Sequence, residues 1–458
     1  MANEYMDYFD INGVKVCLQD YGRDQPNGVP VLDPQGKLPT KYLPTSTLPV
    51  NYADGLLVSP EDPYKDNFVD WVVKLTSPEF KNKGKNWTKA TGAENISGVP
   101  IITHADGLWV LGSPASESKG LWWSEDGKSW TKAVGAEDIS GVLTLTHANG
   151  LWLCGRRRNG VLWSEDGKSW TQGTGPLPTD KIETIMYANG LWVCGSMHGC
   201  WWSKDGKRWT QGTGAITSYA IHIVTYAGGL WVCGSYAIGP SNACLWWSED
   251  GKSWTKGTGI TEGNSFLVNS VTHANGLWVC GNTLKPLWSE DGKSWTRGTT
   301  PQGAGSLHEV VYANGLWLCS MQAKGMLWSE NGKSWRQGTG MDTAFNKYNP
   351  VYANGLWLCS SAQGMWWSEN GKAWTQGTGD NTTYTMQSSV YADGLWVCGS
   401  SDHGVWWSED GKSWSQGTGE NTAYKIFSVA YADGVVICGG AGNGMWWSGE
   451  PVYIPETA

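Results

Sequence analysis

Apolar and polar positions repeat along most of the chain in a unit of about 40 residues. In one such unit, residues 182–214, apolar residues alternate with polar ones at period two, and glycines recur too often for helices. The pattern predicts four short strands per unit, here at residues 182–188, 191–195, 200–203 and 208–212. Two dipeptides with strong turn preferences, Asn189-Gly190 and Asp205-Gly206, separate the strands into tight hairpins.

Tandem units of four antiparallel strands are typical of an all-β fold, the β-propeller. The first three strands occur nine times, but only eight copies are followed by their own fourth strand. The surplus fourth strand, GKNWTKATG at residues 84–92, precedes the first copy. A ring hides both sheet edges if its first strand completes its last blade. We therefore expect residues 81–458 to form about nine four-stranded blades closed by the N-terminal strand.

The segment before the propeller has a different composition. Residues 1–80 include VLDPQGKLPTKYLPTSTLP at 31–49, whose prolines favour extended backbone. They predict a small folded tip and an extended segment that serve for attachment. One stretch, NYADGLLVS at 51–59, resembles the first hairpin of the repeat. A degenerate tenth blade, with residues 70–75 as its third strand, is thus an alternative to nine.

Tryptophan is the unusual feature of the composition, with 33 Trp against 6 Phe, and all but Trp71 lie in the repeats. Each buried Trp removes about 150–250 Å² from water, worth at most about 4–6 kcal/mol. Three recurring positions per unit, such as Trp192, Trp202 and Trp209, would supply most of the core of a unit too small to fold alone. A fourth position alternates between Trp and Leu, which also indicates packing. Sugar-stacking platforms are the alternative interpretation.

Cysteines and histidines follow the repeat as well. Eight of the 11 cysteines share one position, which is Leu111 in the first copy, so we expect buried free thiols rather than disulfides. Three histidines, His104, His147 and His273, stand where other copies have Tyr. Because Tyr replaces them, we expect neither a metal site nor a cofactor.

The charge pattern narrows the classes of partner. The formal net charge is −9, which does not favour nucleic acid, since phosphate binding needs a basic patch. No apolar run approaches the roughly 20 residues that span a bilayer, so membrane insertion is not expected. The N-terminus lacks the basic and apolar regions of a secretory signal.

Constant and variable segments fall on opposite faces of the predicted disc. The YANGLWVCG-type and SEDGKSW-type turns are nearly constant, whereas the other loop of each unit and the crossover between units differ. In a four-stranded antiparallel blade the two kinds of turn share one face and the variable segments share the other. Loops on a rigid scaffold usually carry binding residues, although drift between copies is the alternative. The candidate ligand-binding residues are Arg157, His198, Tyr219, Tyr236, Phe345, Tyr348, Tyr384, His403 and Tyr424.

The constant SEDGKSW turn resembles the Asp-box of sialidase-type propellers, S-x-D-x-G-x-x-W, but its Asp and Gly are adjacent. In that family the motif is a hairpin of the outer two strands, away from the active site. The residues agree: the Asp carboxylate can accept from its own turn, Asn331 and Asn370 can replace it, and both turn residues tolerate positive φ. The resemblance implies that a hydrolase would need an arginine triad, a Tyr–Glu nucleophile pair and an acidic Asp. Arginine is nearly absent from the predicted first strands, so we expect no enzyme and no catalytic residues.

A second resemblance indicates where the protein acts. VLDPQGKLPTKYLP looks like the LDxxGKxPxxxLP segment near the N-termini of bacteriophage tail fibres, and the WSEDGKSW and ANGLWVCG arrays look like those of phage tail-fibre-like proteins. This implies a virion protein, assembled in the host cytoplasm, that contacts other tail proteins through residues 1–80 and a bacterial surface glycan or protein through the propeller. Structural virion decoration, an adaptor and a bacterial propeller lectin are alternatives. Tail fibres are often trimers, so a homotrimer is left open, although no heptad run is present.

Overall fold

The structure is a computed structural model of the 458-residue chain. It describes residues 8–11, 14–17, 84–94, 96, 98, 101–114, 119–175, 181–235, 244–259, 267–283, 285–302, 304–321, 325–341, 347–440 and 444–449, with backbone only for 8–17, 347–349 and 381. The chain divides into two compact units, Met1–Asn82 and Lys83–Ala458. The described part of the first is an antiparallel hairpin of β1 (Tyr8–Ile11) and β2 (Val14–Cys17). The Pro-rich segment and residues 51–59 lie outside the described residues.

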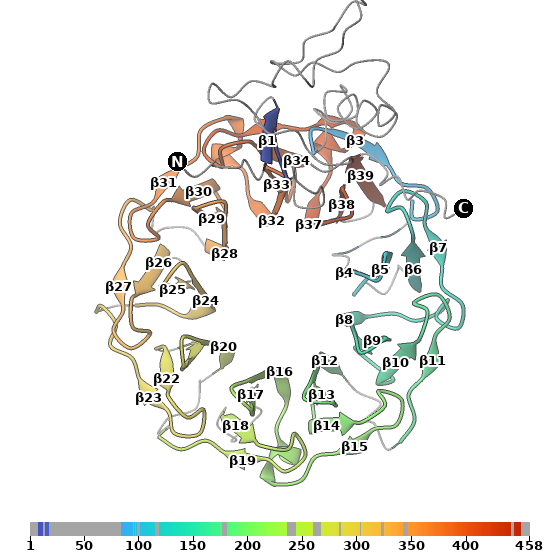
Figure 1. The fold of residues 1–458 in the computed structure, drawn as a ribbon, viewed down its shortest axis with the longest axis vertical. Coiled ribbons are helices and arrows are strands. Elements are labelled where there is room, and N and C mark those ends of the chain that lie inside the picture. The colour runs from blue at the N-terminus through green and yellow to red at the C-terminus, as the bar shows by residue number, and fades with distance from the viewer. Residues whose placement is uncertain are drawn as a thin grey trace, which may run out of the picture. The chain divides into compact units, whose positions relative to one another are not determined.

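The second unit is a ring of nine β-sheets (Figure 1). The innermost strands are β4 (Ile101–Ala105), β8 (Val142–Ala148), β12 (Ile182–Ala188), β16 (Ile221–Ala227), β20 (Val268–Ala274), β24 (Leu307–Ala313), β28 (Lys347–Ala353), β32 (Met386–Ala392) and β37 (Ile426–Ala432). The second strands are β5 (Leu108–Gly112), β9 (Leu151–Arg156), β13 (Leu191–Ser196), β17 (Leu230–Ser235), β21 (Leu277–Asn282), β25 (Leu316–Met321), β29 (Leu356–Ser361), β33 (Leu395–Ser400) and β38 (Val435–Gly440). We number the blades 1 to 9 in this order.

The outer half of each blade is shorter. The third strands are β6 (Leu121–Ser124), β10 (Val161–Ser164), β14 (Gly199–Ser203), β18 (Leu245–Ser248), β22 (Leu287–Ser289), β26 (Gly325–Ser329), β30 (Gly364–Ser368), β34 (Val405–Ser408) and β39 (Met445–Gly449). The fourth strands are β7 (Thr131–Lys132), β11 (Thr171–Gln172), β15 (Thr210–Gln211), β19 (Thr255–Lys256), β23 (Thr296–Arg297), β27 (Arg336–Gln337), β31 (Thr375–Gln376), β35 (Ser415–Gln416) and, in blade 9, β3 (Asn86–Lys89). Three of the described crossovers contain a 3-10 helix: η2 (Ala215–Ser218), η3 (Asp380–Thr383) and η4 (Glu420–Ala423).

The N-terminal strand closes the ring as predicted. β3 pairs antiparallel with β39, with Thr88 opposite Trp447, and so supplies the missing fourth strand of blade 9. It also pairs in parallel with β36 (Thr418–Gly419), the segment that follows β35 of blade 8. Nine blades therefore complete the ring, and the ten-blade alternative is wrong.

The fourth strand is shorter than the sequence predicted, two residues in blade 3 instead of five. Its start pairs with the neighbouring blade instead: the Trp209 N–H donates to the Thr174 carbonyl (3.0 Å), and the Thr174 N–H donates to the Lys207 carbonyl (2.8 Å). Equivalent parallel bridges join every pair of successive blades. The outer strand thus divides its hydrogen bonds between its own blade and the one before it.

The two kinds of turn differ in backbone conformation. Asn189 and Gly190 both have positive φ (49° and 72°), as the Asn-Gly pair predicts. In the Asp205-Gly206 turn only the glycine does (70°), although both residue types tolerate positive φ. The reason is the Asp205 carboxylate, which accepts the N–H groups of Lys207 and Arg208 (both 2.9 Å) and holds an Asx-type turn.

The hydrophobic core lies between blades rather than within them. In one of nine such clusters, Leu153 and Val161 of blade 2 pack with Ile182, Trp192 and Trp209 of blade 3. No blade can bury its apolar faces alone, so each depends on both neighbours, and the ring must close for all nine clusters to form.

The recurring tryptophans have two environments. The second-strand and fourth-strand positions are fully buried, as at Trp192 (1 % exposed) and Trp209 (0 %), which confirms a structural role. The invariant third-strand position, such as Trp202, is half-buried, and a lysine of the next blade, Lys252, lies 4.8 Å from its ring centre. The position that alternates with Leu is buried in both forms, as in Trp201 and Leu162.

The lysine of each SEDGKSW-type turn joins two blades at the outer rim. Lys412 Nζ lies 4.3 Å from the ring centre of Trp367 and 2.7 Å from Glu369 Oε1, both in the preceding blade. Seven of the described junctions have the same Lys–Glu pair. In blade 3 the residue at the Glu position is Lys204, so Lys252 of blade 4 contacts the Trp202 ring without an equivalent glutamate partner. The repeated motif therefore acts as a connector between blades.

The cysteines are buried as predicted, and two of the histidines pack as the equivalent tyrosines do. All ten cysteines whose side chains are described are buried free thiols. His104 and His147 lie 4.6 Å and 4.7 Å, ring centre to ring centre, from the second-strand Trp of their own blades, and Tyr187 lies 4.8 Å from Trp192 in the same way. Within the part of the chain that the structure describes, no three His, Cys, Asp or Glu residues are grouped to hold a metal ion.

Candidate binding face

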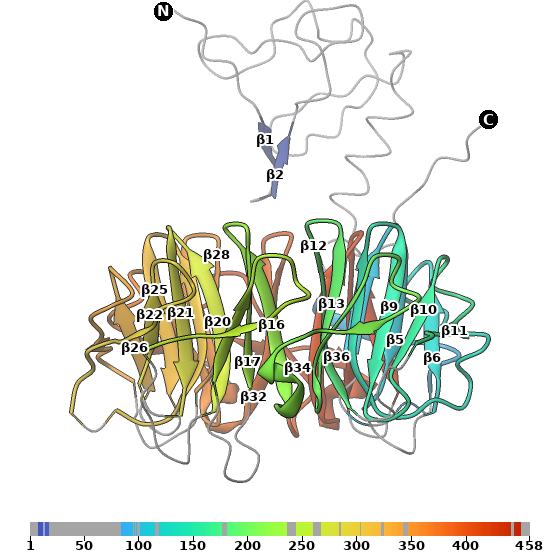
Figure 2. The same ribbon diagram turned by 90° about the horizontal axis from the view of Figure 1, so that it is seen from below.

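The variable segments share one face of the disc. The crossover at Gly135–Ser140 and the blade 2 loop at Arg156–Asn159 line one common pocket. On the opposite face, the Asn354-Gly355 turn of blade 7 lies in one cavity with Glu369 and with Asp410 of blade 8. Figure 2 shows the propeller edge-on, with its loops at these two opposite faces. We call the face of the crossovers and the second-to-third-strand loops the variable face.

The described surface has few exposed large hydrophobic side chains. Of the large hydrophobic side chains in the described ranges, one is exposed, Val134. Contiguous apolar patches are the usual mark of a protein-docking or membrane-binding surface. None of the described segments is a helix long and apolar enough to cross a membrane.

Three of the candidate tyrosines have one common setting. Tyr219 and Tyr424 follow the 3-10 helices η2 and η4 in extended conformation, and Tyr384 follows η3. Each carbonyl accepts the N–H of a loop glycine in the preceding blade, for example Gly364 N–H to the Tyr384 carbonyl at 2.8 Å. Each ring packs against the first Trp of the next third strand, with Tyr219 5.1 Å from Trp246. These tyrosines are half-buried, less exposed than the sequence suggested.

Tyr384 and His403 come together in the structure. Their rings are stacked, with centres 3.5 Å apart and planes 10° from parallel. His403 lies in the blade 8 loop, and its Nδ1 is 2.9 Å from Asp402 Oδ1. Burial raises the pKa of Asp402, but His403 and two serines outweigh it and lower that pKa overall. The result is a partly exposed pair of flat rings with a fixed carboxylate at one end.

The other candidates are placed separately. Arg157 and His198 are exposed on the loops of blades 2 and 3. Tyr236 and Phe345 lie outside the described residues, and Tyr348 is in β28 with only its backbone described. Tyr384 and His403 are thus two candidates that the structure brings together.

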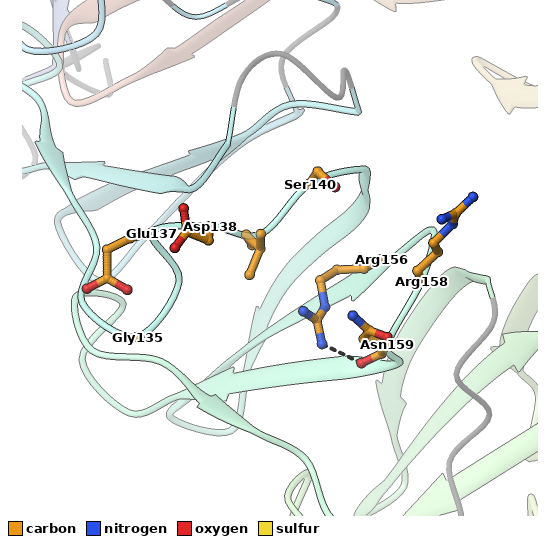
Figure 3. A pocket seen from close by; sticks show the side chains of 8 residues that line it. Gly135, Glu137, Asp138, Ser140, Arg156, Arg158 and Asn159 are labelled. Atoms are coloured by element: carbon orange, nitrogen blue, oxygen red, sulfur yellow. Dashed lines mark hydrogen bonds between the residues drawn. The ribbon is translucent and has the colours of Figure 1, made fainter.

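A pocket of about 310 Å³ lies where the crossover into blade 2 meets the loop between β9 and β10 (Figure 3). Its walls carry Glu137 and Asp138 on one side and Arg156 and Asn159 on the other, and Arg158 stands at the rim. Arg157 is the arginine predicted from the sequence, whereas its two neighbours, Arg156 and Arg158, line this pocket. A comparison of copies could have found Arg156, because the position is uncharged in the eight other blades: Ser113, Ser196, Ser235, Asn282, Met321, Ser361, Ser400 and Gly440.

Arg156 is a buried guanidinium, with 5 % of the residue exposed. Its Nη2 donates to the Asn159 carbonyl and to Gln172 Oε1, the latter at 2.5 Å, and its Nε has no acceptor. Burial lowers the pKa of Arg156 from its ordinary value, and the neighbouring Cys154 offsets this effect only in part. Buried charges are normally paired, so this site holds a cation whose counterion the described chain does not provide.

These features define the protein's class: a nine-bladed β-propeller with a constant face that joins the blades and a variable polar face. No protein-family model matches the chain, and no curated protein sequence matches it. Among solved structures, the Dos1 propeller is similar, with a TM-score of 0.51, 13% identity, and coverage of 80% of this chain and 95% of that one.

Two further solved structures have lower scores. The computationally designed Ika8 protein has a TM-score of 0.48 and 9% identity, and covers 80% of this chain and 99% of its own. Sqt1 of Saccharomyces cerevisiae has a TM-score of 0.49 and 10% identity, and the match covers 68% of this chain and 96% of Sqt1. At these identities the likeness to Dos1 shows the fold alone. Propellers of this kind commonly bind ligands or proteins.

Proposed function

We propose that this chain is a tail-fibre-like host-recognition protein whose variable face binds a bacterial surface glycan. One observation carries the proposal: the blades share one hydrogen-bonded framework on the constant face, while the opposite face carries polar and aromatic side chains that differ between copies. Stacked rings beside hydrogen-bonding groups, as at Tyr384 and His403, suit sugars, which present flat apolar faces edged with hydroxyls.

The N-terminal resemblance supports the location. The segment VLDPQGKLPTKYLP looks like the anchor region of tail fibres, so residues 1–80 would contact other virion proteins. Several copies on one particle would add weak contacts into avidity. The proposal includes no catalysis, because the sequences of the innermost strands lack the arginines that a sialidase-type hydrolase would need.

The test uses the full chain on an array of bacterial surface glycans and on whole cells. The double variant Tyr384→Ala with Tyr424→Ala should lose binding. The control is Asp410→Asn on the constant face, because Asn331 and Asn370 make the same turn contacts in other blades. Binding that survives the double variant, or that is absent from all glycans and cells, would refute the proposal. The second outcome, together with detection of the protein in the body of a particle, would favour structural decoration.

A further inference from the structure

We propose that the pocket beside Arg156 binds a single sugar residue bearing a carboxylate, such as a uronic or sialic acid. This rests on the proposed function and names its ligand class. The first argument is electrostatic: a buried guanidinium with an unused Nε donor and no carboxylate partner in the described chain is incomplete. Arg is the side chain best suited to bind a planar anion through two hydrogen bonds.

The repeat supplies the second argument. In blade 3 the equivalent residue is Ser196, whose hydroxyl donates to the Gly199 carbonyl (3.1 Å) and accepts the Trp201 indole N–H (3.2 Å). A buried serine is therefore sufficient for folding at this position, as it is in five of the nine blades. Arginine in blade 2 is costly to bury and is unnecessary for the blade. A bound anion would pair with the buried guanidinium and offset the cost of burying its charge.

The opposite wall and the size of the pocket favour a sugar over other anions. Asp138 is exposed and makes no described ion pair, so it can accept hydrogen bonds from sugar hydroxyls and would repel a doubly charged phosphate. The Glu137 carboxylate is engaged with its own N–H and that of Gly135, which lower the pKa of Glu137. A volume of about 310 Å³ is at the small end of ligand pockets and fits one sugar ring rather than a chain.

The chain offers a matched pair of variants. Arg156→Ser installs the residue of the other blades, so the fold should survive it, with a melting temperature no lower than that of the wild type. Arg208→Ser removes the same charge from an exposed position of the constant face, where other blades have a serine such as Ser129 or Ser169. Both variants change the net charge equally, so any difference between them reports on the pocket rather than on general electrostatic attraction.

The experiment measures binding of the full chain to a panel of uronic-acid and sialic-acid oligosaccharides, each beside its methyl ester. We expect at least one acid to bind, its ester to fail, and Arg156→Ser to weaken binding about tenfold or more, the factor of one charge-assisted hydrogen bond. Arg208→Ser should bind as the wild type does.

Three results would overturn the inference. They are binding that Arg156→Ser leaves unchanged, equal binding of acids and esters, and tighter binding of a glycerol-phosphate polymer or of polyglutamate than of any acidic sugar. If neutral glycans bind and the Tyr384 variant abolishes that binding, the proposed function stands without this site. If no glycan binds, both fail.

Discussion

The closure of the ring makes Trp87 a sensitive test of the fold. Trp87 belongs to β3, more than 300 residues before the blade that it completes. It is buried with Val397 and Trp446, and its indole N–H donates to the Gly84 carbonyl at 3.1 Å. Trp209 occupies the same position within blade 3 and is also fully buried. If β3 is a structural strand, Trp87→Ala and Trp209→Ala should have similar costs.

The cost can be estimated from burial. Replacing a fully buried Trp by Ala destabilises a protein by about 3–5 kcal/mol, because it removes apolar contact and leaves a cavity. An unfolding entropy of about 2 cal/mol/K per residue over the 376 residues from Lys83 to Ala458 gives roughly 0.8 kcal/mol/K. A loss of about 4 kcal/mol therefore lowers the melting temperature by roughly 5 °C. If residues 84–92 were only a linker, Trp87→Ala would have an effect near zero.

The assay is thermal unfolding of the full chain, with urea titration as the second readout. Both variants should melt about equally below the wild type, in a single transition, because all blades share inter-blade cores. A fall for Trp209→Ala with no change for Trp87→Ala would show that β3 does not close the ring in solution, and would refute the reasoning from strand count.

Three further predictions concern the constant framework. Burial raises the pKa of Asp166, but hydrogen bonds from backbone N–H groups outweigh burial and lower this pKa overall. The Asp166 carboxylate therefore stabilises the fold above about pH 4, and this stabilisation is lost as the pH falls below that value. The difference in melting temperature between wild type and Asp166→Asn should shrink from pH 7 to pH 3, and a constant difference would contradict this. Lys412→Met should lower the free energy of unfolding, measured by urea titration, by less than about 1 kcal/mol, and by less still in high salt, because Lys412 and Glu369 form a surface ion pair. A loss of stability as large as that from replacing a buried Trp would be evidence against this. Burial raises the pKa of Cys154 to about 12, which leaves little reactive thiolate. A thiol reagent should therefore label the repeat cysteines only after unfolding. Rapid labelling of the native protein would contradict this, because it would show that the cores between the blades open.

The sequence predicted the fold because each level of the pattern gave the same answer. Period-two alternation gave the strands, Asn-Gly gave the hairpins, and the displaced GKNW strand gave both blade number and closure. What it missed were interactions between blades. The Lys412–Trp367–Glu369 contact joins residues about 45 positions apart on two sheets, and no local pattern specifies that distance. The short fourth strand was missed for the same reason, since its partner is in the preceding blade.

The candidate site was predicted less well. Tyr384 and His403 were selected separately as exposed polar or aromatic loop residues, and only the structure shows that their rings stack. Tyr384 is half-buried because it directly follows the 3-10 helix η3 and its ring packs against Trp406 of the next blade. Burial also separates the three consecutive arginines of blade 2: one is enclosed, and the other two are exposed.

Arg156 also shows why a repeat protein can be searched for function without relatives. Each blade is a control for the others, since all nine solve the same packing problem with nearly the same residues. A position that is buried and uncharged in eight copies is under a folding constraint, and a charge there in the ninth opposes that constraint. Differences between exposed loop residues carry no such cost and are compatible with drift. The departures that stability disfavours therefore deserve the first binding experiments, and Arg156 is the clearest one among the described residues.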